Sequence, residues 1–269
     1  MLSQENYRTI RIEPRGPVTV LTLNRPERRN AVDDVMHSEL SRLFRDARRC
    51  ADVEVFVLTG AGEAFCSGGD TDPDRPYASA TGLTPIQEAA EIVYGLLELD
   101  QPLIAAVNGD ATGLGALLAS AADVSFAVPG ARFGDAHVQV GLPAGNGPAA
   151  LWPLLAGPQR AKRLLLGGEI VGTEQAVAWG LLHELVPDGR VLDAALELAG
   201  RWARLPRAAV RGTKAVINTA VRAAVAQVLP LSLALEEQAM ADPAFRERLA
   251  AAHEERRRAA GLSRPAAPG

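Results

Sequence analysis

The chain has 269 residues, 48% of them hydrophobic, a length that suits one large domain or a domain with an appendage. Its formal net charge is −4 and its basic residues are mixed with acidic ones, which argues against a nucleic-acid surface because phosphate contacts need a clustered positive patch. We expect a cytoplasmic protein without a metal site or membrane span, because Cys50 and Cys66 lack metal-ligand spacing, the N-terminal segment has no signal-peptide core, and no apolar run reaches about 18 residues.

The first part of the chain alternates strand and helix patterns. Residues 7–13 alternate in polarity and residues 18–23 are rich in β-branched side chains, so with the turn between them they predict a hairpin. The elements predicted after it are a helix over 33–49, a buried strand over 54–60, a loop over 61–82 and an amphipathic helix over 84–100.

The second part continues the alternation and then becomes entirely helical. Its predicted elements are a buried strand (103–109), a small-residue helix (113–123), a strand (124–129), an extended edge (131–138), short helices between 149 and 180, a short strand (181–187) and helices from 191 to 260. This order predicts an α/β core over residues 1–195, a C-terminal helical region over 196–260 and a disordered tail over 261–269.

Two glycine-containing turns follow buried strands and are the first features that suggest chemistry. They are AFCSGGD at 64–70 and NGDATGLGA at 108–116. Adjacent glycines let the backbone approach a ligand closely, and a helix N-terminus offers unpaired N–H donors to negative charge. Each turn by itself is also explained as an ordinary loop or a close helix contact. Together they can direct N–H groups at one carbonyl oxygen, as an oxyanion hole requires.

Five segments in register resemble the crotonase, or enoyl-CoA hydratase/isomerase, superfamily. They are VLTLNRPERRNAV, AFCSGGD, NGDATGLGALLASAAD, ARFGDAHVQVGL and GPQRAKRLLLGGEIVGTEQAVAWGLLHELVP. The resemblance extends from about residue 7 to residue 190, and the helical tail matches more loosely. It implies an α/β fold built as a spiral of ββα units, with C-terminal helices that form trimers or dimers of trimers. It also implies an enzyme that acts on acyl-CoA thioesters and needs no cofactor beyond the CoA of its substrate.

The resemblance also assigns roles to individual residues. It places the oxyanion donors at the backbone N–H groups of Gly69 and Leu114. The positions that correspond to the CoA-binding segments are Arg28, Arg29, Ala31, Ser67, Gly68 and Asp70. Arg25 joins Arg28 and Arg29 as an expected partner of the CoA phosphates, because the guanidinium group suits phosphate. The alternative for each arginine is a solvated basic turn.

The chain departs from the hydratases of this family at both of their catalytic glutamates. Hydration of an enoyl thioester uses two carboxylates to position a water and move its proton. One glutamate position is Leu117 here, which we interpret as apolar lining of the acyl pocket. The other is His137, whose imidazole titrates near neutral pH and can act as an acid or a base. We therefore expect hydrolytic cleavage or isomerisation rather than two-glutamate hydration.

His137 has a candidate partner nine residues along the chain. Some relatives that hydrolyse β-diketones pair a histidine at this position with an aspartate nine residues later, where this chain has Asn146. Asn146 can orient a water or the imidazole but cannot hold a negative charge. Catalysis, pocket lining and a purely structural role all remain open for His137, and Asp135 would face the same side if the segment is extended.

The remaining candidates favour structural interpretations. Glu88 and Glu91 lie on the helix that covers the acyl pocket in relatives, where either could supply a missing carboxylate. A solvated helix face is the favoured interpretation of both. Phe133 and Trp152 are expected to pack in the core. Two other functions stay open: a scaffold that binds acyl-CoA without turnover, and a hydratase that uses a water held by His137.

Overall fold

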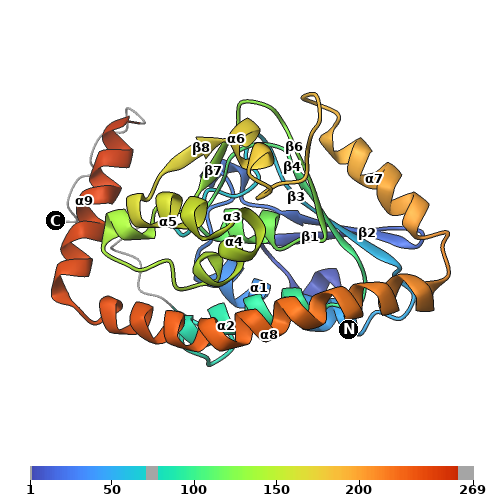
Figure 1. Ribbon diagram of the computed structural model, residues 1–269, viewed down its shortest axis with the longest axis horizontal. Coiled ribbons are helices and arrows are strands. Elements are labelled where there is room, and N and C mark those ends of the chain that lie inside the picture. The colour runs from blue at the N-terminus through green and yellow to red at the C-terminus, as the bar shows by residue number, and fades with distance from the viewer. Residues whose placement is uncertain (1, 71–77, 260–269) are drawn as a thin grey trace.

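A computed structural model describes residues 2–70 and 78–259, so the predicted tail over 261–269 lies outside the described residues. A six-stranded sheet with the order β1-β2-β3-β4-β6-β9 forms the centre of the molecule (Figure 1). β1 and β2 form the predicted antiparallel hairpin, and β2, β3, β4, β6 and β9 run parallel to one another. The strands are Ile10–Arg15, Val18–Leu23, Val55–Gly60, Leu103–Val107, Val124–Ala127 and Glu184–Leu185.

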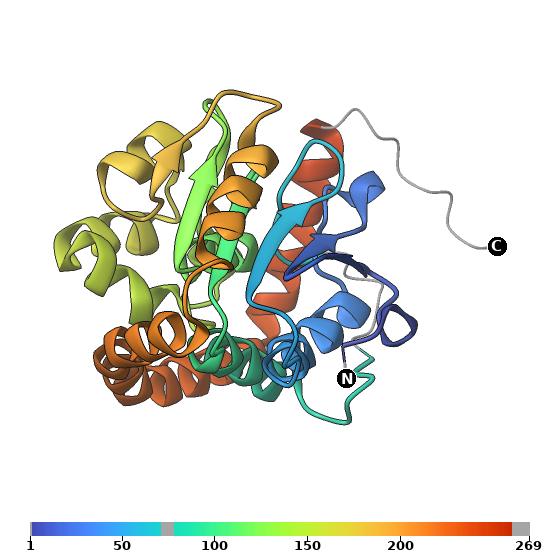
Figure 2. The same cartoon turned by 90° about the vertical axis from the view of Figure 1, so that its right-hand side faces the viewer.

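Both faces of this sheet are covered, which explains why its central strands are apolar throughout rather than alternating. Leu21, Leu58 and Ala105 belong to the larger core, on the face covered by α1 (Asp34–Arg48), α2 (Pro85–Glu98) and α3 (Leu114–Ser120). The intervening residues of the same strands form a second cluster against α7 (Val191–Trp202). Figure 1 shows α7 above the strands and α1 and α2 below them, and in Figure 2 α7 lies in front of the strands.

A second, three-stranded sheet carries the segment that contains His137. It has the order β5-β7-β8, from Ala111–Thr112, Arg132–Gly134 and Ile170–Gly172. The predicted extended edge over 131–138 is therefore wrong in its second half, because β7 ends at Gly134 and His137–Val140 form the short 3-10 helix η3. At Gly134, the last residue of β7, φ is 157° and a β-carbon would lie 2.7 Å from the carbonyl oxygen of Glu169 and 2.8 Å from Cδ1 of Ile170, so a side chain does not fit there.

Five further helices within the described residues pack around the two sheets. They are α4 (Pro148–Ala156), α5 (Pro158–Gly167), α6 (Thr173–Ala178), α8 (Arg207–Met240) and α9 (Pro243–Ala259). As predicted, Trp152 of α4 is fully buried and stacks on Phe133, with 5.4 Å between the ring centroids. The predicted boundary between residues 195 and 196 falls inside α7, which packs on the central sheet.

α8 extends along one side of the molecule and contacts α2 and α4, and α9 follows it at an angle (Figure 1). Among the described residues it is the single helix that is long and apolar enough to cross a membrane, with a mean hydropathy of 1.4 over its best window. This differs from the expectation that no such segment exists. Only 17% of that window is buried, so α8 exposes an apolar face while a narrow stripe packs on the core.

Candidate functional site

The two glycine turns are brought into contact by the backbone. Isolated bridges pair Val32 with Gly69 and Cys66 with Ala111. Gly68 has φ 86°, and a side chain there would meet the carbonyl oxygen of Thr112 at 2.9 Å. Gly113 has φ 56°, and a β-carbon there would lie 3.3 Å from the α-carbon of Gly68. Both positions therefore require glycine, for the positive φ and for the close approach of the two chains.

This contact places the two predicted oxyanion donors at one pocket. Leu114 is the first residue of α3, where a helix has no internal partner for its N–H. Gly69 is exposed, and a β-carbon there would meet nothing within 4 Å. Within residues 2–70 and 78–259, neither N–H donates a backbone hydrogen bond outside the regular elements. Both residues line the same cavity, so both N–H groups are available to a ligand in it.

The cavity has a volume of about 400 Å³ and combines this polar wall with apolar surroundings. Its other polar groups include His37, His137, Asn146 and Glu236. Apolar side chains from four helices and two loops form the rest of the lining, among them Val32, Ile86, Ala89, Leu142, Phe245 and Leu249. A few convergent polar groups in an apolar cavity are typical of a small-molecule site.

His137 lies at this cavity with its ring held by Asp135. Its Nδ1 is 2.5 Å from Oδ1 of Asp135, and the same oxygen accepts a hydrogen bond from the backbone N–H of His137. The pair thus forms through the turn into η3, not through an extended segment. Burial lowers the pKa of His137, but the charge of Asp135 and its hydrogen bond outweigh this effect and raise the pKa to about 9. Asp135 therefore favours the imidazolium form, with Nε2 directed away from it.

Asn146 approaches the other ring nitrogen. Its Nδ2 lies 3.4 Å from Nε2 of His137, at the long limit of a hydrogen bond, and its Oδ1 is buried without a partner among the described residues. A neutral ring accepts from the amide NH2 at Nε2, whereas an imidazolium needs an acceptor there. Turning the amide by 180° would supply Oδ1 as that acceptor. Asn146 therefore suits either protonation state, as expected of a residue that orients the ring.

Glu236 is a pocket residue that sequence reasoning missed. It lies on α8, is 3% exposed, and its Oε1 is 4.0 Å from Nε2 of His137. Burial raises the pKa of Glu236 to about 7, with the charge of His137 acting in the opposite direction. A signal existed in the sequence, because Val225, Leu229, Leu233 and Glu236 share one helical stripe. A glutamate that continues an apolar stripe is expected to be buried. Its separation from His137 along the chain, however, gives no sign that the two side chains are close in space.

Comparisons with known proteins show which family the chain belongs to. Residues 13–260 match the sequence model of the enoyl-CoA hydratase/isomerase family. The chain belongs to this family. It is 38% identical over 208 residues to the 1,2-epoxyphenylacetyl-CoA isomerase of Escherichia coli K12, covering 76% of this chain and 79% of that protein. It is 34% identical over 207 residues to the (E)-benzylidenesuccinyl-CoA hydratase of Thauera aromatica, covering 76% and 80%.

Solved structures of the family share the fold. An enoyl-CoA hydratase/isomerase from Mycobacterium paratuberculosis superposes with a TM-score of 0.85 at 33% identity, covering 91% of this chain and 99% of that one. The predicted crotonase fold, with its α/β core and C-terminal helices, is thereby confirmed. Membership of the enoyl-CoA hydratase/isomerase family makes the protein an enzyme of acyl-CoA thioesters.

The predicted CoA-binding residues lie on two adjacent segments. The N–H of Ser67 bonds the carbonyl oxygen of Arg29, and the N–H of Asp70 bonds that of Val32, so residues 29–32 follow residues 67–70 closely. Ser67, Gly68 and Asp70 line the cavity, and Arg28 and Ala31 lie on the adjoining segment. Arg29 is half-exposed, and its guanidinium bonds Asp110 at 2.7 Å.

Arg25 differs from the expectation that it meets the phosphates. Its side chain is 11% exposed, forms ion pairs with Asp33 and Asp70 at 3.1 and 3.2 Å, and donates to the carbonyl oxygen of Ala31. A guanidinium engaged by two carboxylates in a nearly closed site holds the turn in shape. Asp70 accordingly has a structural partner as well as a place at the cavity.

Leu117 and Glu88 also lie differently from the expectation. Leu117 is buried but lines a separate small cavity between α2, α3, α4 and α8, not the cavity of His137. Glu88 does not lie on a solvated face, because it is fully buried. It accepts hydrogen bonds from Ser38, Ser79 and Thr81 and lies 2.8 Å from Nδ1 of His37. Glu91 is half-exposed as predicted.

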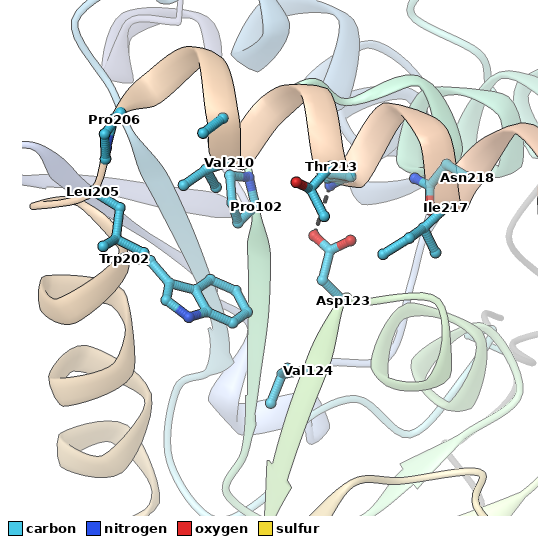
Figure 3. A pocket seen from close by; sticks show the side chains of 12 residues that line it. Pro102, Asp123, Val124, Trp202, Leu205, Pro206, Val210, Thr213, Ile217 and Asn218 are labelled. Atoms are coloured by element: carbon cyan, nitrogen blue, oxygen red, sulfur yellow. Dashed lines mark hydrogen bonds and ion pairs between the residues drawn. The ribbon is translucent and has the colours of Figure 1, made fainter.

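A second hollow lies between α7, α8 and the end of β4, with a volume of about 590 Å³. Figure 3 shows Trp202, Leu205, Val210 and Ile217 around it, with Asp123 at its inner side. The Asp123 carboxylate is occupied by an ion pair with Lys214 at 2.6 Å. The hollow thus offers an apolar surface without a free acid or base, and the described residues contain no cluster of three metal-binding side chains. The cavity of His137 is therefore the candidate active site.

Proposed function

We propose that the protein catalyses proton transfer at the carbon next to the thioester carbonyl of an acyl-CoA. The enolate or oxyanion formed there accepts hydrogen bonds from the N–H groups of Gly69 and Leu114. His137 is the acid/base group, its ring fixed by Asp135 and Asn146. The observation that carries the proposal is the meeting of two glycine turns with a carboxylate-held histidine in one cavity. The proposal uses no cofactor besides the CoA of the substrate.

The type of reaction depends on whether one or two acid/base groups take part. With His137 as the single group, isomerisation or hydrolytic cleavage is favoured over two-glutamate hydration, because Leu117 stands at one glutamate position. The relative named 1,2-epoxyphenylacetyl-CoA isomerase supports such a reaction. Hydration is the second candidate, and the observation that favours it is the buried carboxylate of Glu236 beside His137. A relative named (E)-benzylidenesuccinyl-CoA hydratase agrees with it.

The test is turnover of a panel of enoyl-, 3-oxoacyl- and aryl-CoA esters, with products followed by mass spectrometry. His137→Ala should reduce turnover by about 10²–10⁴-fold, the usual contribution of a general acid or base. His183→Ala is the matched control, since the side chain of His183 is 59% exposed and outside the cavity. Wild-type turnover by His137→Ala would refute the assignment. If no ester reacts but CoA esters raise the melting temperature, the protein is a binding scaffold without turnover.

We further propose that the chain forms homo-trimers or dimers of trimers. α8 exposes a series of large apolar side chains, and one of them, Ile217, also lines the apolar hollow between α7 and α8. The exposed apolar residues of α8 are Val216, Ile217, Val228, Leu231 and Leu235. Water contact along such a face is unfavourable, and a second copy of the chain would remove it. Sedimentation of the wild type against the double variant Ile217→Asp and Leu231→Asp tests this, with a change to monomer expected.

The cytoplasm is the proposed location. The two cysteines support it, because Cys50 and Cys66 are both free thiols. A reporter fusion to the full chain, followed by cell fractionation, tests this location. Recovery of the fusion with the membrane fraction would refute it.

A further inference from the structure

Glu236 is placed where an ordinary helix residue would be apolar. The buried residues Val225, Leu229 and Leu233 precede it on the same stripe of α8 and belong to the large core. Among the ionisable side chains of α8, only Lys214 and Glu236 are buried, and Lys214 pairs with Asp123. Burial of a carboxylate is costly unless a cation is paired with it, and the cationic partner that the structure gives Glu236 is the ring of His137, 4.0 Å away.

Gly145 leaves room for the carboxylate of Glu236, and one of its two oxygens has no hydrogen-bond partner among the described residues. A β-carbon at Gly145 would lie 2.2 Å from Oε2 and 2.6 Å from the β-carbon of Glu236, so only glycine accommodates the side chain there. Oε2 is buried without a hydrogen-bond partner within the described part of the chain. Oε2 faces Gly145, whereas Oε1 faces the ring of His137 at the cavity that both residues line.

The separation of Glu236 and His137 fits one small bridging molecule. The 4.0 Å between Oε1 and Nε2 is too long for a direct hydrogen bond. An oxygen atom at about 2.8 Å from both atoms fits between them at an angle near 90°, which is within the range for water. Such an oxygen would lie in the cavity that Gly69 and Leu114 also line.

We propose that Glu236 is the base that activates water for addition to an α,β-unsaturated acyl-CoA, with the imidazolium of His137 as the acid. This inference rests on the second candidate of the proposed function, hydration, and it uses the same oxyanion donors and the same histidine. It supplies from α8 the second acid/base group that Leu117 cannot provide.

The step balances within the cavity. Glu236 removes a proton from water, and the water oxygen forms a bond to C3 of the enoyl group. The electron pair of the C2–C3 double bond moves toward C1, and the thioester oxygen becomes an enolate held by the two N–H groups. His137 then gives its Nε2 proton to C2, and the electrons return from oxygen. Glu236 is left protonated and His137 neutral, and transfer of the proton between them restores the starting state. No oxidant or further reactant is needed.

The protonation states required are those that the surroundings favour. Asp135 holds the pKa of His137 near 9, so the ring is an acid at neutral pH. Burial raises the pKa of Glu236 to about 7, which matches the pKa of a base that works near neutrality. His37 and Asp70 line the same cavity, and Arg248 of α9 lies against Gly141 at the end of η3. We expect kcat/KM to rise with pH as Glu236 ionises and to fall as His137 loses its proton.

The experiment compares Glu236→Gln with Glu237→Gln, the neighbouring and exposed glutamate of α8. Crotonyl-CoA, 2-octenoyl-CoA and cinnamoyl-CoA are incubated with the full-length protein in H₂¹⁸O, and ¹⁸O in the 3-hydroxyacyl product is measured by mass spectrometry. Glu236→Gln should lower kcat by about 10²–10⁴-fold with little change in KM and should abolish the acidic limb of the pH profile. Glu237→Gln should match the wild type. Glu236→Asp retains a carboxylate and should keep the acidic limb at a reduced rate.

Other outcomes separate this inference from the proposed function. Wild-type rate and pH profile in a folded Glu236→Gln, with an inactive His137→Ala, would overturn the role of Glu236 and leave the proposed function standing. So would exchange of solvent deuterium into C2 of a saturated acyl-CoA without any incorporation of ¹⁸O from water into the products of the enoyl esters. If none of these CoA esters is bound or changed by the wild type, both proposals fail together.

Discussion

Replacing Asp135 by asparagine tests what sets the protonation state of His137. Against the effect of burial, the charge and hydrogen bond of Asp135, with a smaller contribution from the charge of Glu236, raise the pKa of His137 from 6.5 to about 9. A difference of this size corresponds to about 3 kcal/mol of interaction with the imidazolium form. Because asparagine carries no charge, burial and the smaller opposing effect of Glu236 remain, and we expect the pKa of His137 in Asp135→Asn to fall to near 6.5.

The sign of the effect on stability follows from linkage. A histidine whose pKa is raised on folding stabilises the native state fully below its unfolded pKa of about 6.5, and this stabilisation is lost as the pH rises through about 9. Asp135→Asn should therefore reduce the free energy of unfolding by about 3 kcal/mol at pH 6 and much less at pH 10.

Urea unfolding at fixed protein concentration measures this difference, and an NMR titration of the imidazole measures the pKa directly. Asp193→Asn is the control, since the side chain of Asp193 is 60% exposed. The reasoning is refuted if the variant keeps a His137 pKa near 9, or if its loss of stability is the same at both pH values.

Three further substitutions probe the site and its support. Gly113→Ala forces an alanine to φ 56° against Gly68. We therefore expect the free energy of unfolding to fall by about 1–3 kcal/mol and kcat to fall about 10²-fold. Gly212→Ala is the control, because open space surrounds that position and neither quantity should change. Glu88→Ala removes the acceptor of three hydroxyl groups and should cost about 3 kcal/mol in urea unfolding, whereas the half-exposed Glu91→Ala should cost little; equal costs would contradict the buried network. Trp152→Ala should cost about 3–5 kcal/mol, because the indole is fully buried against Phe133; a thermal shift below a few degrees would contradict this.

The sequence predicted most elements of the core because their signals are local. The apolar runs of β3 and β4 and the spacing of α1 and α2 depend on residues close in the chain, and the structure has these elements within a few residues of the predicted ends. The extended edge failed after Gly134, since a short 3-10 helix has little periodicity of its own. Glu88 was misjudged because helical spacing does not say that serine and threonine hydroxyl groups from the loop and α1 will surround a carboxylate.

By itself the sequence determined the fold, the two glycine turns and His137 as a candidate acid/base, since each has a signature within a few residues. Only the tertiary structure decided which carboxylates meet that histidine. Asp135 reaches it through a turn, and Glu236 reaches it from a helix that begins 70 residues later, at Arg207. The physical reason is that acid/base chemistry depends on separations of a few ångströms and on burial. Both are set by how α8 packs over the cavity, and no pattern along the chain records that packing.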